Sequence, residues 1–206
     1  MERNQAATLP KEAIIALAGA AISYKKYGLA VIMLLGFAGL LRTMEIAKVK
    51  KEHCVAMEKG KKWCILLPWT KNVTRTGNSE QVIIDSPVLV KFLAWYLRKL
   101  SDEDLLYEGG ARGLSVDLRW LGEKIGLEDR NLTPYLLRCS RATWHFTHFG
   151  KLDRTASLGR WAQIKTARIY INASTVALTK SKFTAQQNSR IKAAAKVARG
   201  FIAAPF

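Results

Sequence analysis

Two arginines, Arg42 and Arg138, lie in stretches that are otherwise apolar and have the residue spacing of helices. The guanidinium group is planar and always charged, and it binds two phosphate oxygens at once. A charge on an apolar helix needs a partner, and a phosphate group is one such partner. The alternative is a buried ion pair within the protein, for example between Arg42 and Glu45. The residues alone leave both interpretations open.

The overall charge favours the phosphate interpretation. The chain of 206 residues has a formal net charge of +17 and an isoelectric point near 10.0. A protein this basic is expected to bind polyanions, with nucleic acid as the first candidate. A surface excess of lysine and arginine that only keeps the protein in solution is the other explanation.

The cysteines, the histidines and the N-terminal residues indicate the compartment of the protein and argue against a metal site. Three cysteines without motif spacing, Cys54, Cys64 and Cys139, indicate free thiols in a reducing compartment. His145 and His148 lack the companions of a metal site and are interpreted as ordinary helix residues. The polar N-terminus is not a secretory signal, so we expect a protein located inside the cell with the DNA, in the nucleus of a eukaryote or the cytoplasm and nucleoid of a prokaryote.

The sequence predicts a mainly α fold with a small antiparallel β-sheet (α+β), in a single domain. We expect a first helix from about Pro10 to Tyr24 and a buried helix that opens at Gly28 and continues to Ile46. Its apolar run, residues 28–41, is too short to span a bilayer. Strands are expected at residues 61–69 and 81–85, where Pro68 suggests an edge strand. Further helices are expected at residues 86–100, at 114–127 and after residue 133.

The order of several short motifs resembles the catalytic domain of the tyrosine recombinases, the phage-integrase-type family. Residues 36–46 (GFAGLLRTMEI) look like that family's Gly-Leu-Arg-x-x-Glu box, and residues 67–71 (LPWTK) look like its catalytic hairpin. Residues 135–138 (YLLR) fall on its His-x-x-Arg motif. Trp161 and Tyr170 keep the spacing between the family's His/Trp position and its nucleophile. The resemblance runs from about residue 8 to residue 174.

The resemblance implies an enzyme that breaks and rejoins DNA in site-specific recombination or integration, as in mobile elements. Tyr170 would attack a DNA phosphate to form a 3′-phosphotyrosyl link, while the arginines stabilise the transition state and Lys71 protonates the leaving 5′-oxygen. The covalent link conserves the phosphodiester energy, so no metal or cofactor is expected. The implied catalytic residues are Arg42, Lys71, Tyr135, Arg138, Trp161 and Tyr170.

Two positions depart from the usual pattern of the family. Tyr135 stands where histidine is usual, and a phenol donates a hydrogen bond but accepts a proton poorly near neutral pH. Trp161 replaces the second histidine, as in Cre-like members, and its indole N–H can donate to a phosphate. Judged by its surroundings alone, Tyr170 also suits a core position on a short helix.

The resemblance also suggests a domain organisation and partners. We expect a short extension at residues 1–8, the catalytic domain at 9–178, and a basic tail at 179–206 that docks on a neighbouring protomer or is disordered. The pattern starts so early that no core-binding clamp domain precedes it, which suggests a fragment or relic. The expected partners are double-stranded DNA and further copies of the chain, as a dimer or tetramer on DNA. Neither a membrane nor a small-molecule substrate is expected.

Two other functions fit the same residues. A catalytically impaired, DNA-binding relic of a mobile-element integrase would keep the fold without the chemistry, as the tyrosine at position 135 suggests. A type IB topoisomerase-like enzyme would share the chemistry and relax supercoiled DNA as a monomer.

Overall fold

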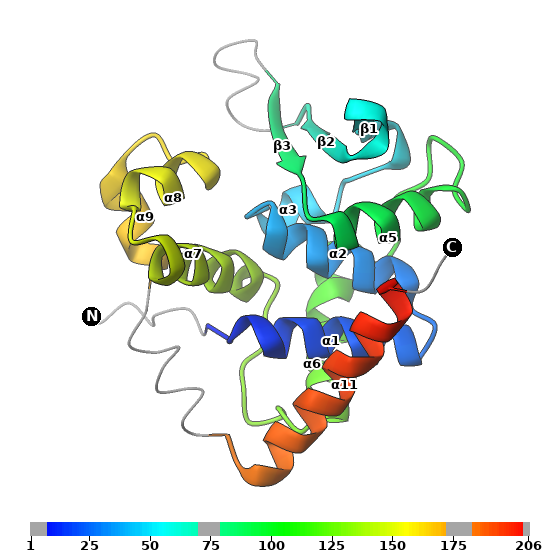
Figure 1. Ribbon diagram of the computed structural model, residues 1–206, viewed down its shortest axis with the longest axis vertical. Helices are drawn as coiled ribbons and strands as arrows, with labels where there is room; N and C mark the ends of the chain where they lie inside the picture. Colours follow the sequence, from blue (N-terminus) through cyan, green and yellow to red (C-terminus); the bar gives the residue numbers. More distant parts are fainter. Residues whose placement is uncertain (1–7, 70–78, 172–182, 204–206) are drawn as a thin grey trace.

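The computed structural model describes residues 8–69, 79–171 and 183–203, which form a mainly helical protein with a small antiparallel sheet (Figure 1). This confirms the predicted fold class. The helices are α1 (Lys11–Ser23), α2 (Tyr27–Ala38), α3 (Thr43–Ile46), α5 (Pro87–Leu97), α6 (Gly110–Ile125), α7 (Tyr135–Phe149), α8 (Leu152–Leu158), α9 (Ile164–Tyr170) and α11 (Ala185–Ala203). Short 3-10 turns lie at Lys51–His53 and Glu58–Gly60, and the strands are β1 (Cys54–Met57), β2 (Lys62–Leu67) and β3 (Glu80–Ile84).

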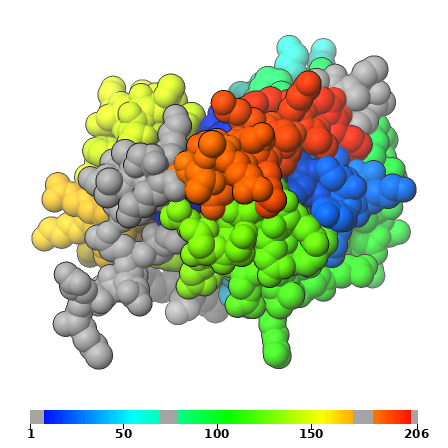
Figure 2. Space-filling view, turned by 90° about the horizontal axis from the view of Figure 1, so that it is seen from below, coloured from blue at the N-terminus to red at the C-terminus, as the bar shows by residue number. Residues whose placement is uncertain are grey.

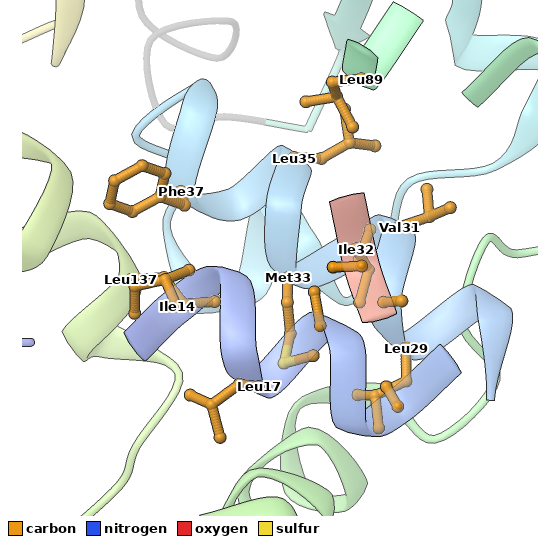
Figure 3. Close-up of a cluster of buried hydrophobic side chains, with 14 of the residues drawn as sticks. Ile14, Leu17, Leu29, Val31, Ile32, Met33, Leu35, Phe37, Leu89 and Leu137 are labelled. Atoms are coloured by element: carbon orange, nitrogen blue, oxygen red, sulfur yellow. The ribbon is translucent and has the colours of Figure 1, made fainter. Parts of the chain in front are cut away.

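Helix α2 is the centre of the core. Nearly all of its residues are apolar, so it is buried on several sides and packs against α1, α5 and α7. Figure 3 shows Met33 of α2 next to α1, which carries Leu17, and Leu137 of α7 beside Ile14 of α1. Along the parts of the chain that the structure describes, no helix has the length and apolar character to cross a membrane.

The buried helix ends earlier than the sequence predicts. It was expected to continue to Ile46, but α2 ends at Ala38, and Leu40 has a left-handed backbone with φ of 46°. A Cβ on Gly39 would lie 2.7 Å from Val82, so the glycine allows this turn to pass close under β3. The break places Arg42 in an extended conformation at the N-terminus of α3 instead of on a continuous helix.

The sheet has the order β1-β2-β3, with both pairs antiparallel. The two predicted strands are present as β2 and β3. The prediction that Pro68 marks an edge strand is wrong, because β1 pairs with the other side of β2 and Pro68 lies just beyond the end of β2. Strand β1 was not predicted, since most of its side chains are exposed and show no alternation.

The C-terminal helix α11 packs on α1 of the same chain and also contacts α5 and α6. Figure 2 shows it lying across the surface next to those elements. The helices are so close that a Cβ on Gly19 would lie 1.8 Å from the carbonyl oxygen of Ala194. The buried residues of α11 recur at helical spacing and are Ile191, Ala195, Ala198 and Ile202.

Residues 183–203 include helix α11, which packs on α1, within the segment where the sequence suggests a basic tail. The basic residues of this segment and the resemblance together suggest a tail that is disordered or docked on another protomer. The structure instead places its small apolar stripe in the core of the chain, while the charged residues line the other face of the helix.

Candidate functional site

Helix α7 carries the second predicted arginine into the interior. Tyr135 and Arg138 lie one turn apart near the start of this helix, so their side chains share a face. Arg138 is only 1% exposed. Its guanidinium donates to the carbonyl oxygen of Leu40, in the left-handed turn after α2, and to that of Gly159 at 2.6 Å. Its Nε has no partner within the described residues.

Two aromatic rings cover Arg138. The centre of the Trp161 ring lies 4.5 Å from its guanidinium carbon, and that of Tyr170 lies at 5.5 Å. The two rings are in contact with a centroid distance of 4.6 Å, and the rings of Tyr135 and Tyr170 are 5.5 Å apart. The structure therefore brings together four of the residues that the sequence predicts for the site.

The position of Tyr170 is fixed by the helix that it ends. Helix α9 packs on α7 and α8, with Ala167 fully buried. The Thr143 hydroxyl on α7 donates to the backbone carbonyl of Tyr170 at 3.1 Å. In Figure 1, α8 and α9 lie at one end of α7. The tyrosine is thus held at the end of a short helix rather than inside the core, and its side chain is half-buried.

Arg42 lies at the edge of the same site. Its side chain is 43% exposed, and its Nη1 is 2.5 Å from Glu45 and 3.2 Å from Glu80. Glu45 also accepts the backbone N–H of Arg42 at 2.7 Å, which caps the first turn of α3. The ion pair that the sequence allowed is therefore present, on an arginine that remains open to solvent.

Arg160 is a further member of the site that the sequence predictions missed. Its Nη2 is 2.5 Å from Glu45, its Nε is 2.9 Å from Glu80, and its Nη1 donates to the carbonyl oxygen of Gly39 at 3.3 Å. It stands between Gly159 and Trp161, as one residue more than the Leu-Gly-His/Trp pattern contains. That extra residue is the signal that was overlooked.

The electrostatics of the site favour an anion. Burial, followed by repulsion from Arg42 and Arg160, lowers the pKa of the Arg138 guanidinium. Three guanidinium groups and the two carboxylates of Glu45 and Glu80 leave one positive charge. A phosphate group would add the opposite charge beside Arg138 and relieve this repulsion.

The phenol of Tyr135 stays protonated in this environment. Burial first, and then its hydrogen bond with the Tyr170 side chain, raise the pKa of Tyr135. Arg138 acts in the opposite direction and is outweighed. Tyr135 is thus a hydrogen-bond donor near neutral pH rather than a base.

Other chemistries find less support at this site. Burial raises the pKa of the nearby Cys139 thiol to about 12, so this cysteine is not a thiolate nucleophile at neutral pH. Within residues 8–69, 79–171 and 183–203, no three His, Cys, Asp or Glu side chains gather where they could hold a metal ion. Lys71, the predicted acid, lies outside the described residues.

A scan against protein-family models and a search of curated proteins gave no match. The chain is similar to crystal structures of the XerH site-specific recombinase bound to difH substrates. The palindromic post-cleavage complex has a TM-score of 0.62 and 18% identity over 81% of this chain. The pre-cleavage complex has a TM-score of 0.63 and 17% identity over 88% of this chain.

The crystal structure of XerA recombinase is a third similar protein, with a TM-score of 0.63 and 21% identity over 88% of this chain and 67% of its own. The similarity covers 50% and 54% of the two XerH chains, so this chain spans about half their length. The chain has the fold of a tyrosine recombinase catalytic domain.

Proposed function

We propose that this chain breaks and rejoins double-stranded DNA in site-specific recombination, through a 3′-phosphotyrosyl intermediate on Tyr170. The observation that carries the proposal is the burial of Arg138 under the rings of Trp161 and Tyr170. A fixed cation close to a tyrosine can stabilise the negative charge that develops when the tyrosine attacks a phosphate. The net charge of +17 supports DNA as the phosphate source.

The proposed reaction exchanges one phosphate ester for another. The Tyr170 oxygen forms a bond to phosphorus and gives up its proton to solvent, while the bond from phosphorus to the 5′-oxygen breaks. Lys71 supplies the proton to the leaving 5′-hydroxyl. Arg42 and Arg138 stabilise the charge on the non-bridging oxygens, to which Tyr135 and Trp161 also donate. The reverse reaction with a new 5′-hydroxyl rejoins the strand.

The covering rings set a requirement on this reaction. Because Arg138 is 1% exposed, a phosphate oxygen reaches its guanidinium only after Trp161 or Tyr170 moves aside. Arg42 is accessible without such a movement. We therefore expect DNA to contact Arg42 first and Arg138 when the site opens.

A suicide substrate tests the proposal. The purified protein is mixed with nicked duplexes from its own genomic flanks, denatured, and examined for a DNA–protein adduct. Tyr170→Phe is expected to abolish the adduct. Tyr24→Phe is the matched control, because Tyr24 is exposed and packs on Trp120, away from the site. An adduct that persists in Tyr170→Phe would contradict the proposed nucleophile.

A DNA-binding relic without cleavage activity is the second candidate. It is favoured by the tyrosine at position 135 and by the pairing of Arg42 with two carboxylates. This function predicts DNA binding that weakens steeply with salt and no adduct with any flank sequence. It is distinguished from the first by the same assay.

Assembly on DNA is part of the same proposal. Strand exchange joins two duplexes, so we expect two or four copies of the chain on recombining DNA, inside the cell. Sedimentation of the protein with its cleaved substrate tests this expectation, and a single copy per duplex would favour a topoisomerase-like relaxing activity instead.

A further inference from the structure

Arg160 contacts the groups that surround Arg42 rather than the tyrosine. Within the described residues, its guanidinium donates to Glu45, to Glu80 and to the carbonyl oxygen of Gly39. Its side chain is 12% exposed, against 43% for Arg42. The two arginines thus share the same pair of carboxylates, one from the interior and one from the surface.

We propose that Arg160 is a positioning residue that neutralises Glu45 and Glu80 and so leaves the charge of Arg42 available to the DNA phosphate. This inference rests on the proposed function. Glu45 and Glu80 are 4% and 11% exposed and need cationic partners. Without Arg160, the two positive charges of Arg42 and Arg138 would be matched by the two negative charges of Glu45 and Glu80.

The pKa of Glu80 is shifted in the direction that this pairing predicts. Burial acts to raise it, but Arg160, followed by Arg42, outweighs burial and holds the pKa below its ordinary value. Within the described residues, Arg42 reaches both carboxylates through Nη1 alone. Its other guanidinium nitrogens are outside these ion pairs, on a side chain that solvent reaches.

The backbone at Arg160 points to a role for its side chain. Its φ of 56° is a left-handed conformation that favours glycine over residues with a Cβ. The preceding Gly159 is required as well, because a Cβ there would lie 2.2 Å from the Trp161 ring. An arginine kept in an unfavourable conformation, with three bonds to the Arg42 site, is best explained by its charge.

The competing explanation is purely structural: Arg160 ties the turn after α8 to α3 and β3. The two explanations differ in what happens when a carboxylate is neutralised. If Arg160 acts by charge, removing the Glu80 charge in an Arg160 variant restores the balance. If Arg160 acts only by holding the turn against α3 and β3, removing the Glu80 charge as well slows adduct formation further.

The test compares Arg160→Gly, Arg160→Lys and the double variant Arg160→Gly/Glu80→Gln. Glycine suits the left-handed backbone, so this variant isolates the loss of the side chain. Lysine keeps the charge and the same backbone demand. Glu80 is chosen over Glu45 because Glu45 also caps α3 through the backbone of Arg42. Thermal unfolding and DNA affinity are measured for each protein, together with the rate of adduct formation at saturating DNA.

We expect Arg160→Gly to slow adduct formation by about 10- to 100-fold at saturating DNA, which is less than for loss of a donor that contacts the transition state directly. Arg160→Lys is expected to be faster than Arg160→Gly, and the double variant to recover most of the lost rate. A folded Arg160→Gly protein with the wild-type rate would overturn the inference, as would a double variant no faster than the single one. If Arg160→Gly fails to fold, a folded Arg160→Lys protein that no longer forms the adduct would also overturn the inference. A wild-type protein that binds DNA without forming an adduct would refute strand cleavage itself and this inference with it.

Discussion

The Thr143 hydroxyl on α7 donates a hydrogen bond of 3.1 Å to the backbone carbonyl of Tyr170. The two residues are far apart in the sequence, and the bond fixes the end of α9 against the helix that carries Arg138. Thr143 is fully buried, so its hydroxyl does not exchange this partner for water. Tyr170, the proposed nucleophile, is therefore oriented through its backbone as well as through the rings that touch its side chain.

Thr143→Val tests this orientation. Valine keeps the shape of threonine, and loss of one buried hydrogen bond is expected to lower the free energy of unfolding by about 1–3 kcal/mol. The rate of adduct formation should fall more than DNA affinity does, because the tyrosine is less well held. Thr147→Val is the control, since Thr147 donates only within its own helix among the bonds seen in the described residues. Equal effects of the two substitutions on the rate would contradict this role.

Tyr135 is predicted to act as a hydrogen-bond donor. Tyr135→Phe removes the hydroxyl that bonds to Tyr170 and should slow adduct formation without preventing DNA binding. Tyr135→His should support cleavage, and its cleavage rate should change with pH near the ordinary histidine pKa of about 6.5. The wild-type rate should show no such step from this position, because the pKa of Tyr135 is raised. Cleavage rates between pH 5 and 8 measure the difference.

The two arginines are predicted to differ in their contribution to stability. Arg138→Met removes bonds to two buried carbonyl groups, so we expect a loss of about 2–4 kcal/mol in the free energy of unfolding. Arg42→Met alters a side chain that is half exposed, and its carboxylates keep Arg160, so the loss should be under about 1 kcal/mol. Both variants should lose adduct formation. Chemical denaturation together with the suicide substrate separates the two effects.

The contact between α1 and α11 gives a direct test of the C-terminal helix. Gly19→Ala places a Cβ against the carbonyl oxygen of Ala194, so the helices must separate and the melting temperature should fall. In Gly200→Ala the added Cβ meets nothing within 4 Å, and the better helix former should stabilise the protein by about 0.5–1 kcal/mol. If both substitutions stabilise the protein, α11 does not pack on α1 in this way.

The loss of folding stability at acidic pH should depend on Glu80. Because its pKa is lower in the folded state, the folded protein binds fewer protons than the unfolded chain does. The resulting stabilisation is present above the ordinary carboxyl value of about 4.3 and is lost as the pH falls through the folded pKa. The melting temperature of Glu80→Gln should therefore fall less between pH 5 and 3 than that of the wild type. Parallel curves for the two proteins would contradict the ion-pair network.

The sequence predicted the local parts of the fold better than the contacts between them. The helix around Leu17, the buried run around Met33 and the termination near Gly126 follow from apolar spacing and from the left-handed glycine at that helix end. The break in the helix at Leu40 could not be predicted in this way. Its left-handed backbone depends on contacts with β3 and on the hydrogen bond that Arg138 donates to the Leu40 carbonyl oxygen. The packing of α11 on α1 of the same chain was not predicted either, because the lysines and arginines of this segment indicated an exposed tail.

The same contrast holds for the site. Tyr135, Arg138, Trp161 and Tyr170 were found from motif order, and the structure brings them together. Glu80 and Arg160 were not found, since they meet only through tertiary contacts over 80 positions of sequence. Charge pairs of this kind leave no periodic signal along the chain. The role of Lys71 stays a prediction, because that residue lies outside the described ranges.

The most direct test of the central claim is to locate the DNA on the protein. After reaction with a nicked duplex, nuclease and trypsin digestion leaves a short nucleotide on the cleaved peptide, and fragmentation mass spectrometry identifies the modified residue. The account predicts a 3′-linked nucleotide on Tyr170, in the tryptic peptide of residues 169–180. A nucleotide on another residue, or folded protein that binds the cleavable duplex and carries none, would contradict it.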